Sequence, residues 1–242
     1  MSKKNIFLPL LWGIAIIVLL YNMFYLENGF FANGTIIIGW ILFVYQYTIN
    51  HSEKLYMLTH RAKSFLINNS NQWDFQFEFV SNDFELCNID KVVNESSKIK
   101  KNINFNLSRK QITTENGLII EISKDNSTNK VVFSINDLIV PYRESQKILD
   151  NHISPIIETI LHDYTIKDVK FSLSINLKKK NPYYGFFLKN IDETSNLIYF
   201  QVQLKMGLGR IDILHDRVII SSNKFIEIAR TAKDILAFRA TS

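Results

Sequence analysis

The sequence predicts a membrane-anchored α+β protein, in which a transmembrane helical hairpin at residues 1–50 precedes a cytosolic, antiparallel β-rich domain with packed helices. Two apolar runs, Ile6–Leu26 and Phe30–Ile49, each approach the roughly 20 residues that a helix needs to cross a hydrocarbon core. Beyond residue 70, segments of alternating polar and apolar residues follow one another without regularly alternating helices. Such a pattern favours hairpins and an antiparallel sheet.

The first 50 residues contain one charged residue between Lys4 and Glu53, namely Glu27, which separates the two apolar runs. A segment inside lipid has to satisfy its own backbone hydrogen bonds, so both runs are expected to be helical. A secretory signal peptide followed by a buried helix is an alternative, but the first run lacks a small-residue cleavage site. Asn33 and Gly34 lie near the start of the second run, which leaves a segment at the membrane interface as a further alternative.

Basic residues flank the hairpin on both sides, whereas the loop between the two runs has none. These flanking residues are Lys3, Lys4, Lys54, His60, Arg61 and Lys63. The positive-inside rule therefore predicts a two-pass protein of the inner (plasma) membrane with both termini in the cytoplasm. Residues 51–70 are expected to form a basic amphipathic helix along the membrane, or alternatively an ordinary solvated helix.

The composition of the 242-residue chain is mildly basic, with a formal net charge of +5. A surplus of this size suits a domain beside a lipid bilayer with anionic headgroups, and is too small to indicate a nucleic acid polymer as partner. Cys87 is the only cysteine, so an intrachain disulfide is excluded, in agreement with a reducing compartment.

Residues 71–242 are expected to form the cytosolic domain. Its clearest strand is Trp73–Val80, whose aromatic face of Trp73, Phe75, Phe77 and Phe79 indicates a core, with a ligand cavity as the alternative. Further strands are predicted at Ile103–Leu107, Gly117–Ser123, Lys130–Ile135, Leu138–Val140, Val169–Leu177, Tyr184–Ile191, Leu197–Met206 and Gly209–Ile220. Helices are predicted at Asn88–Ile99, at Tyr142–Leu161 with a break near Pro155, and at Asn223–Phe238.

The order of several strands followed by a helix occurs twice in this domain. It suggests an internal duplication, with halves at residues 71–164 and 165–242.

No catalytic or cofactor motif is recognisable in the sequence. The five histidines are scattered, and none lies at metal-ligand spacing from a second ligand. Gly207-Leu208-Gly209 is interpreted as a turn, because no helix follows it to hold a phosphate. We therefore expect no catalytic residue, no metal, no cofactor and no enzyme activity.

A patch of basic and aromatic residues is the best candidate for a ligand site. Lys178, Lys179 and Lys180 precede Tyr183 and Tyr184 between two predicted strands. Three ammonium groups beside two aromatic rings can bind phosphates and stack on a base. Anionic lipid is an alternative ligand, and solvated lysines that protect a sheet edge are a third interpretation. Secondary candidates for an anion site are Lys205, Arg210 and Arg217.

The two apolar spans, Ile6–Leu26 and Phe30–Ile49, precede a strand series that begins at Trp73. This layout resembles the two-transmembrane, β-strand-rich effectors of bacterial cyclic-oligonucleotide antiphage (CBASS-like) systems. The resemblance implies a β-barrel that binds a cyclic nucleotide, and a homo-oligomer whose assembled hairpins perturb the membrane. The chain departs from that pattern because helices interrupt its strands, so no pocket residue is carried over.

A second hypothesis is a membrane-anchored scaffold or docking subunit, without enzyme activity, of a conjugation or secretion machine. Two-span hairpins followed by a small mixed domain also occur at the start of conjugative DNA translocases. A nucleotide cyclase encoded beside this chain would favour the first hypothesis, and a conjugation operon would favour the second.

Overall fold

The computed structural model describes residues 4–25, 29–177, 181–188, 201–207 and 209–236. The chain divides into two compact units, Met1–Thr59 and His60–Ser242, and each unit is considered by itself. Helix α3 (Glu53–Ile67) contributes residues to both units.

The first unit consists mainly of two long helices. They are α1 (Lys4–Tyr25) and α2 (Gly29–His51). Leu11 of α1 is buried together with Val44 of α2. The Nε1–H of Trp12 donates a hydrogen bond of 2.9 Å to the Oγ1 of Thr48, which in turn donates to the carbonyl of Val44. Among the side chains that the structure describes, a small apolar cluster and the hydrogen bond between Trp12 and Thr48 therefore join the two helices.

Among the residues that the structure describes, no helix is both long enough and apolar enough to cross a membrane. The membrane-anchored fold class, the transmembrane hairpin at residues 1–50 and the two-pass inner-membrane location with cytoplasmic termini are therefore wrong. The prediction weighed Asn33 and Gly34 at the start of the second run, but not Gln46 and Thr48, which also lie within α2. Thr48 uses its hydroxyl group to hold the two helices together rather than to continue an apolar surface.

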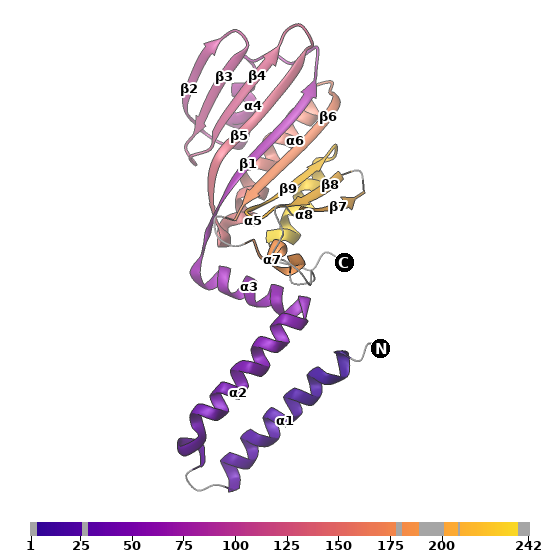
Figure 1. Ribbon diagram of the computed structural model, residues 1–242. Helices are drawn as coiled ribbons and strands as arrows, with labels where there is room; N and C mark the ends of the chain where they lie inside the picture. Colours follow the sequence, from indigo (N-terminus) through magenta and orange to yellow (C-terminus); the bar gives the residue numbers. More distant parts are fainter. Residues whose placement is uncertain (1–3, 26–28, 178–180, 189–200, 208, 237–242) are drawn as a thin grey trace. The chain divides into compact units, whose positions relative to one another are not determined.

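The second unit is an α+β domain built on one antiparallel, nine-stranded sheet (Figure 1). Its strands are β1 (Ser70–Val80), β2 (Ile99–Asn106), β3 (Arg109–Thr114), β4 (Ile119–Asp125), β5 (Lys130–Pro141), β6 (Lys167–Asn176), β7 (Val202–Met206), β8 (Gly209–Ile213) and β9 (Arg217–Ser222). Its helices are α4 (Ile89–Ser96), α5 (Ser145–Ile148), α6 (Ser154–Asp163), α7 (Pro182–Leu188) and α8 (Phe225–Leu236), with a 3₁₀ turn at Tyr142–Glu144 and a π-helical turn at Leu149–Ile153.

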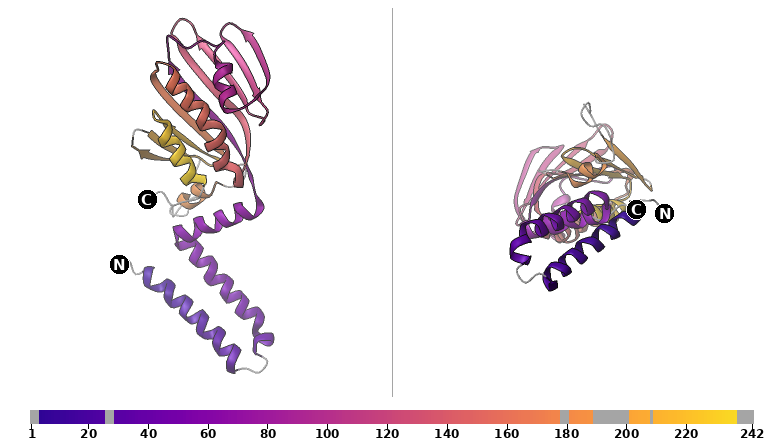
Figure 2. Two further views of the ribbon diagram at one scale, coloured as in Figure 1. Left: turned by 180° about the vertical axis from the view of Figure 1, so that it is seen from behind. Right: turned by 60° about the horizontal axis from the view of Figure 1, so that its bottom comes forward.

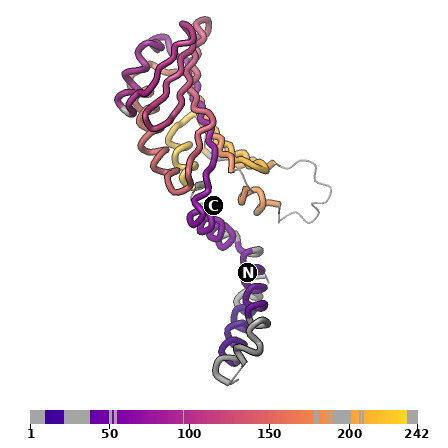
Figure 3. Tube along the Cα trace, turned by 90° about the vertical axis from the view of Figure 1, so that its left-hand side faces the viewer, coloured from indigo at the N-terminus to yellow at the C-terminus, as the bar shows by residue number. Residues whose placement is uncertain are grey.

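The strand order is β2-β3-β4-β5-β1-β6-β9-β8-β7, so β1 and β6 form the central pair. Each of these two strands is also paired with the last strand of its own meander, β5 for β1 and β9 for β6. Figure 3 shows the two groups of strands at opposite ends of the sheet. Since β2 and β7 each have a single neighbour in this order, the sheet that the described strands form is open. The internal duplication stays a prediction.

The core lies on one face of the sheet, which α4, α6 and α8 cover (Figure 2). The aromatic residues of β1, namely Trp73, Phe75, Phe77 and Phe79, are all buried there. Phe77 stacks on Phe171 of β6, with 4.5 Å between the ring centroids. Of the two interpretations of this aromatic face, the structure therefore shows the core.

One predicted strand is a helix in the structure. The strand expected at Tyr184–Ile191 overlaps α7, which begins at Pro182. The side chain of Asn181 accepts a hydrogen bond of 3.1 Å from the backbone N–H of Tyr183, as an N-cap residue does. Asparagine followed by proline is a helix-start signal, because the fixed φ of proline suits the first helical position. The prediction of a strand at Tyr184–Ile191 did not take this helix-start signal into account.

The helical segment between the two halves also differs from the expected one. A break was expected near Pro155, but this residue lies in the first turn of α6, where proline is tolerated. The irregularity is instead the π-helical turn at Leu149–Ile153. The Oγ–H of Ser154 donates to the carbonyl of Leu149, five residues earlier, and so supports the wider turn.

Candidate functional site

The residues of the predicted basic and aromatic patch do not come together as a described site. Lys178, Lys179 and Lys180 lie outside the described residues. Tyr183 is only 3% exposed, and its hydroxyl donates a hydrogen bond of 2.9 Å to the carbonyl of Ile235 in α8. The ring of Tyr184 packs edge-on against His215, with 5.3 Å between the centroids. Both tyrosines therefore make contacts within the fold.

Arg217 is part of an ion pair in the turn between β8 and β9. Its Nε lies 3.1 Å from one carboxylate oxygen of Asp216, and an Nη lies 3.0 Å from the other. Hydrogen bonding to Arg217 lowers the pKa of Asp216, and the same contact raises the pKa of Arg217. Because this guanidinium is engaged by its neighbour in the sequence, Arg217 is a weak candidate for a ligand contact.

Lys205 and Arg210 are direct partners across the β7–β8 hairpin. They belong to the face of the sheet that α4, α6 and α8 leave uncovered, which we call the open face. One cross-strand row on this face runs through Glu121, Ser134, Gln76, Ser172, Ser221, Arg210 and Lys205. Side chains of successive residues in a strand point to opposite faces, so the polar half of each alternating strand gathers here.

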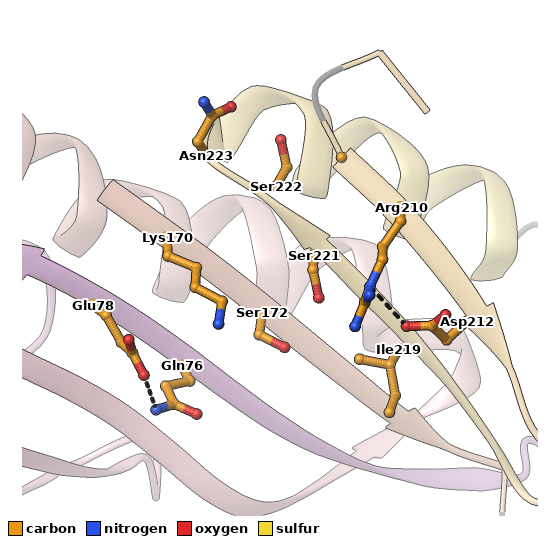
Figure 4. Close-up of a pocket in the computed structure, with 11 residues that line it drawn as sticks. Gln76, Glu78, Lys170, Ser172, Arg210, Asp212, Ile219, Ser221, Ser222 and Asn223 are labelled. Carbon is orange, nitrogen blue, oxygen red and sulfur yellow. Dashed lines mark hydrogen bonds and ion pairs between the residues drawn. The ribbon is translucent and has the colours of Figure 1, made fainter. Parts of the chain in front are cut away.

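A pocket of about 660 Å³ lies on the open face over β1, β6, β9 and β8 (Figure 4). We call it the anion pocket. It is lined by Gln76, Glu78, Lys170, Ser172, Gly209, Arg210, Asp212, Ile219, Ser221, Ser222 and Asn223. Of the predicted site residues, Arg210 alone is in this lining. The pocket thus contains two cations, two carboxylates and several neutral polar side chains.

The two carboxylates of the anion pocket already have donors. Asp212 is buried, and it accepts hydrogen bonds from the Nε2 of Gln201 at 3.2 Å and of Gln203 at 2.9 Å. It also pairs with the Nε of Arg210 at 3.1 Å. Glu78 accepts a hydrogen bond from Gln76 beside it, and pairs with the Nζ of Lys130 on β5 at 3.0 Å.

The two cations are more available than the carboxylates. None of the ion pairs among the described residues includes Lys170, which is exposed. Arg210 pairs through its Nε, and its side chain is 60% exposed. In Figure 4 Lys170 and Arg210 lie on opposite sides of Ser172 and Ser221. The pocket is therefore a polar floor with an accessible cation at either side.

One end of the anion pocket lies where β9 passes into α8. The Oγ–H of Ser222 donates to Glu227 at 2.7 Å, and the same oxygen accepts the backbone N–H of Lys224. A Cβ on Gly209 would lie only 2.4 Å from the carbonyl oxygen of Ser221. The absence of a side chain at Gly209 thus allows β8 to approach β9 closely under the pocket.

The described residues contain no group of three or more His, Cys, Asp and Glu side chains placed to hold a metal ion. His162 and Asp163 do contact each other at 2.9 Å, but the histidine is exposed and the pair lies at the end of α6. The anion pocket contains serine hydroxyls without a neighbouring histidine to activate them as nucleophiles. The described lining offers hydrogen-bonding groups and charged side chains for contact with a ligand.

Comparison of the sequence with models of protein families and with curated proteins gives no match.

The anion pocket was not predicted from the sequence as one site, although some of its residues could be recognised there. In the predicted strand Val169–Leu177, polar residues alternate with apolar ones, so Lys170 and Ser172 share one face. What was missing is the pairing of β6 with β9 and of β9 with β8, which brings these residues next to Arg210.

Proposed function

We propose that the sheet domain is a ligand-binding module without enzyme activity, and that it binds a small anionic ligand of nucleotide size in the anion pocket. The observation that carries the proposal is the placement of Lys170 and Arg210 on either side of a hydroxyl-lined and amide-lined floor. Charge-assisted hydrogen bonds to phosphate are stronger than neutral ones. Since both carboxylates of the pocket are engaged, they oppose an incoming anion less than free ones would.

The spacing of the cations supports a ligand larger than a lone phosphate. Lys170 and Arg210 are on β6 and β8, with β9 between them. Arg210 is level with Ser172, two residues along β6 from Lys170. Two strand spacings and this offset separate the two cations by roughly 12 Å at the backbone. A ligand of that reach can place anionic groups near both cations, while Ser172 and Ser221, which lie between them, contact its neutral middle. Nucleotides, cyclic ones included, have this chemistry.

Assembly into a homo-oligomer is part of the same proposal. A ligand can shift an assembly equilibrium only through its different affinity for the two states. A ligand that contacts three strands of the open face would favour an assembly in which this face stays accessible, or one in which a second subunit adds contacts to the bound ligand. Ligand-dependent assembly is measured by light scattering with and without the bound nucleotide.

The test is calorimetric titration of the full-length protein with a panel of nucleoside monophosphates, nucleoside triphosphates and cyclic dinucleotides, and with inorganic phosphate. For the nucleotide that binds, Lys170→Ala and Arg210→Ala should each weaken binding by about 10- to 100-fold, because a hydrogen bond to a charged group contributes about 1.5–3 kcal/mol.

The matched control is Arg109→Ala, which removes a cation from the other end of the open face. Arg109 is paired with Glu121 at 3.4 Å and does not line the anion pocket. Its removal should leave binding unchanged. The proposal is overturned if no member of the panel binds, or if Lys170→Ala and Arg210→Ala bind as tightly as the wild type.

A further inference from the structure

The segment of residues 96–114 contains five basic residues and no acidic one. The basic residues are Lys98, Lys100, Lys101, Arg109 and Lys110. Arg109 pairs with Glu121, and Lys110 pairs with Asp90 at 2.7 Å. The three lysines at and beside the start of β2 are exposed and take part in none of the ion pairs found among the described residues.

These lysines lie on an edge of the sheet. Strand β2 pairs with β3 on one side, and on its other side no described strand follows in the sheet order (Figure 1). Its regular pairing with β3 extends from Lys101 to Asn104, with irregularities at either end. The outer N–H and C=O groups of such an edge are a template for an added strand.

Large apolar side chains accompany the charges at this edge. Phe105 is 55% exposed and Leu107 is 95% exposed. The guanidinium of Arg109 lies over the ring of Phe105, 5.6 Å from its centroid, which holds this ring toward the open face. Lysines alone would be explained as protection of an edge against pairing. Exposed phenylalanine and leucine side chains beside them do not protect an edge in this way, and they offer apolar contacts to a partner.

We propose that the outer edge of β2 binds an extended, acidic segment of a partner protein, which adds to the sheet as a further strand. In this mode the main chain supplies affinity and alternate side chains supply specificity. Lys101 and Ile103 face the open side, since they are directly opposite Thr113 and Gln111 of β3. The partner should therefore have an acidic residue beside Lys101 and apolar residues, at alternate positions, beside Ile103 and Phe105.

Charge complementarity selects this occupant over a second copy of the chain. Pairing of two β2 edges would bring together six lysines with no acidic residue from 96 to 114 in either copy. Like charges on directly paired strands are destabilising. This docking edge is at the opposite end of the sheet from the anion pocket, so it is independent of the function proposed above.

The test uses the full-length protein and a fluorescently labelled synthetic peptide in which glutamates are followed by valine and phenylalanine at alternate positions. Fluorescence anisotropy should show saturable binding of this peptide. A peptide of the same composition in scrambled order, and a peptide N-methylated on the residues that would pair with β2, should bind at least about tenfold more weakly, since they lose the pattern or the main-chain hydrogen bonds.

Charge reversal at the edge provides the second arm. Lys100→Glu/Lys101→Glu should weaken binding of the glutamate peptide at least about tenfold and should bind the corresponding lysine peptide instead. The control Lys91→Glu/Lys147→Glu makes the same change of net charge at exposed helix positions and should leave binding unchanged. Equal binding of the ordered, scrambled and N-methylated peptides, or an equal effect of both double variants, would overturn the proposal in favour of non-specific attraction.

Discussion

The two ends of the open face use their charges differently. At the end built by β3, β4 and β5, cations are paired with carboxylates on the neighbouring strand, as Arg109 is with Glu121 and Lys130 with Glu78. At the end built by β6, β9 and β8, no such pair among the described residues includes Lys170. The two ends therefore differ in Lys170, an exposed cation of the β6–β8 end that takes part in none of these ion pairs.

The difference matters because exposed ion pairs contribute little to stability, typically about 0–1 kcal/mol. Pairing Arg109 with Glu121 mainly removes a charge that could attract a ligand. Asp212 likewise engages Arg210 through its Nε, and the two arginine side chains are similarly exposed, Arg109 at 55% and Arg210 at 60%. Lys170, which none of the ion pairs among the described residues includes, is what distinguishes the β6–β8 end.

The centre of the sheet should be the most sensitive to substitution. Phe171→Ala would leave a cavity where the ring stacks on Phe77 and contacts Phe225, so we expect a loss of about 3–5 kcal/mol in the free energy of unfolding. Phe105→Ala, at the exposed edge, should change it by less than about 0.5 kcal/mol. Denaturant unfolding measures both. Similar losses for the two variants would contradict the division into a packed centre and an open edge.

Substitution by alanine at two glycines, one from each end of the sheet, should lower the free energy of unfolding for different reasons. Gly209→Ala places a Cβ against the Ser221 carbonyl, a ladder group that cannot move aside, and we expect a loss of about 1–3 kcal/mol together with weaker nucleotide binding. Gly117 has open space around it but a φ of +81°, so Gly117→Ala should cost about 1–2 kcal/mol without affecting binding. Stability and titration measured on both variants separate the two causes. Unchanged nucleotide binding in Gly209→Ala would contradict its role under the pocket.

Removal of one negative charge from each end sharpens the comparison further. Asp212→Asn should strengthen nucleotide binding several-fold, because it frees Arg210, while costing about 1–3 kcal/mol of stability through the weakened buried contacts. Glu121→Gln frees Arg109, which lies away from the anion pocket, and should leave binding unchanged. Titration of the same nucleotide into both variants separates an effect of the anion pocket from an effect of overall charge. Equal gains would mean that overall charge, rather than the pocket, attracts the ligand.

Local patterns in the sequence were sufficient for the strongest strands. Alternation predicted Trp73–Val80, which lies within β1, and Val169–Leu177, which overlaps β6 and extends one residue past its end. The apolar stripe of Asn223–Phe238 likewise contains α8. Each of these elements has one buried face. Burial of one face produces a periodic spacing of apolar residues that can be recognised in the sequence.

Contacts between distant segments were not readable in the same way. The anion pocket depends on β9 lying between β6 and β8. The alternation of residues within one strand does not indicate which other strand will pair with it. The wrong predictions arose where composition was weighed without context. Gln46 and Thr48 inside the second apolar run were not weighed, and the helix start at Asn181-Pro182 was overlooked beside alternating aromatics.

The smallest effect is expected on the pH dependence of unfolding, and it concerns two carboxylates, Asp83 and Asp125. The pKa values of both are lowered to about 2. In Asp83 the causes are hydrogen bonds from the hydroxyl of Ser81 and from the backbone of Thr165, 82 residues away. In Asp125 the causes are hydrogen bonds from Ser127 and its turn neighbour Thr128. The two groups thus have similar pKa values, one through a contact that joins the two halves and the other through a local turn.

A carboxyl group whose pKa is lower in the folded than in the unfolded chain stabilises the fold above its unfolded pKa, and that stabilisation is lost as the pH falls toward its folded pKa. For Asp83 the window runs from about pH 4 down to about pH 2, since its ordinary pKa is 3.8. The contacts of Asp125 lie within three residues and can persist in the unfolded chain, so its pKa should differ less between the two states. Asp83→Asn should therefore flatten the pH dependence of unfolding across this window more than Asp125→Asn does. Denaturant unfolding at several pH values between 2 and 5 measures this, and an equal or larger flattening in Asp125→Asn would show that the contact between Asp83 and Thr165 does not join the halves as described.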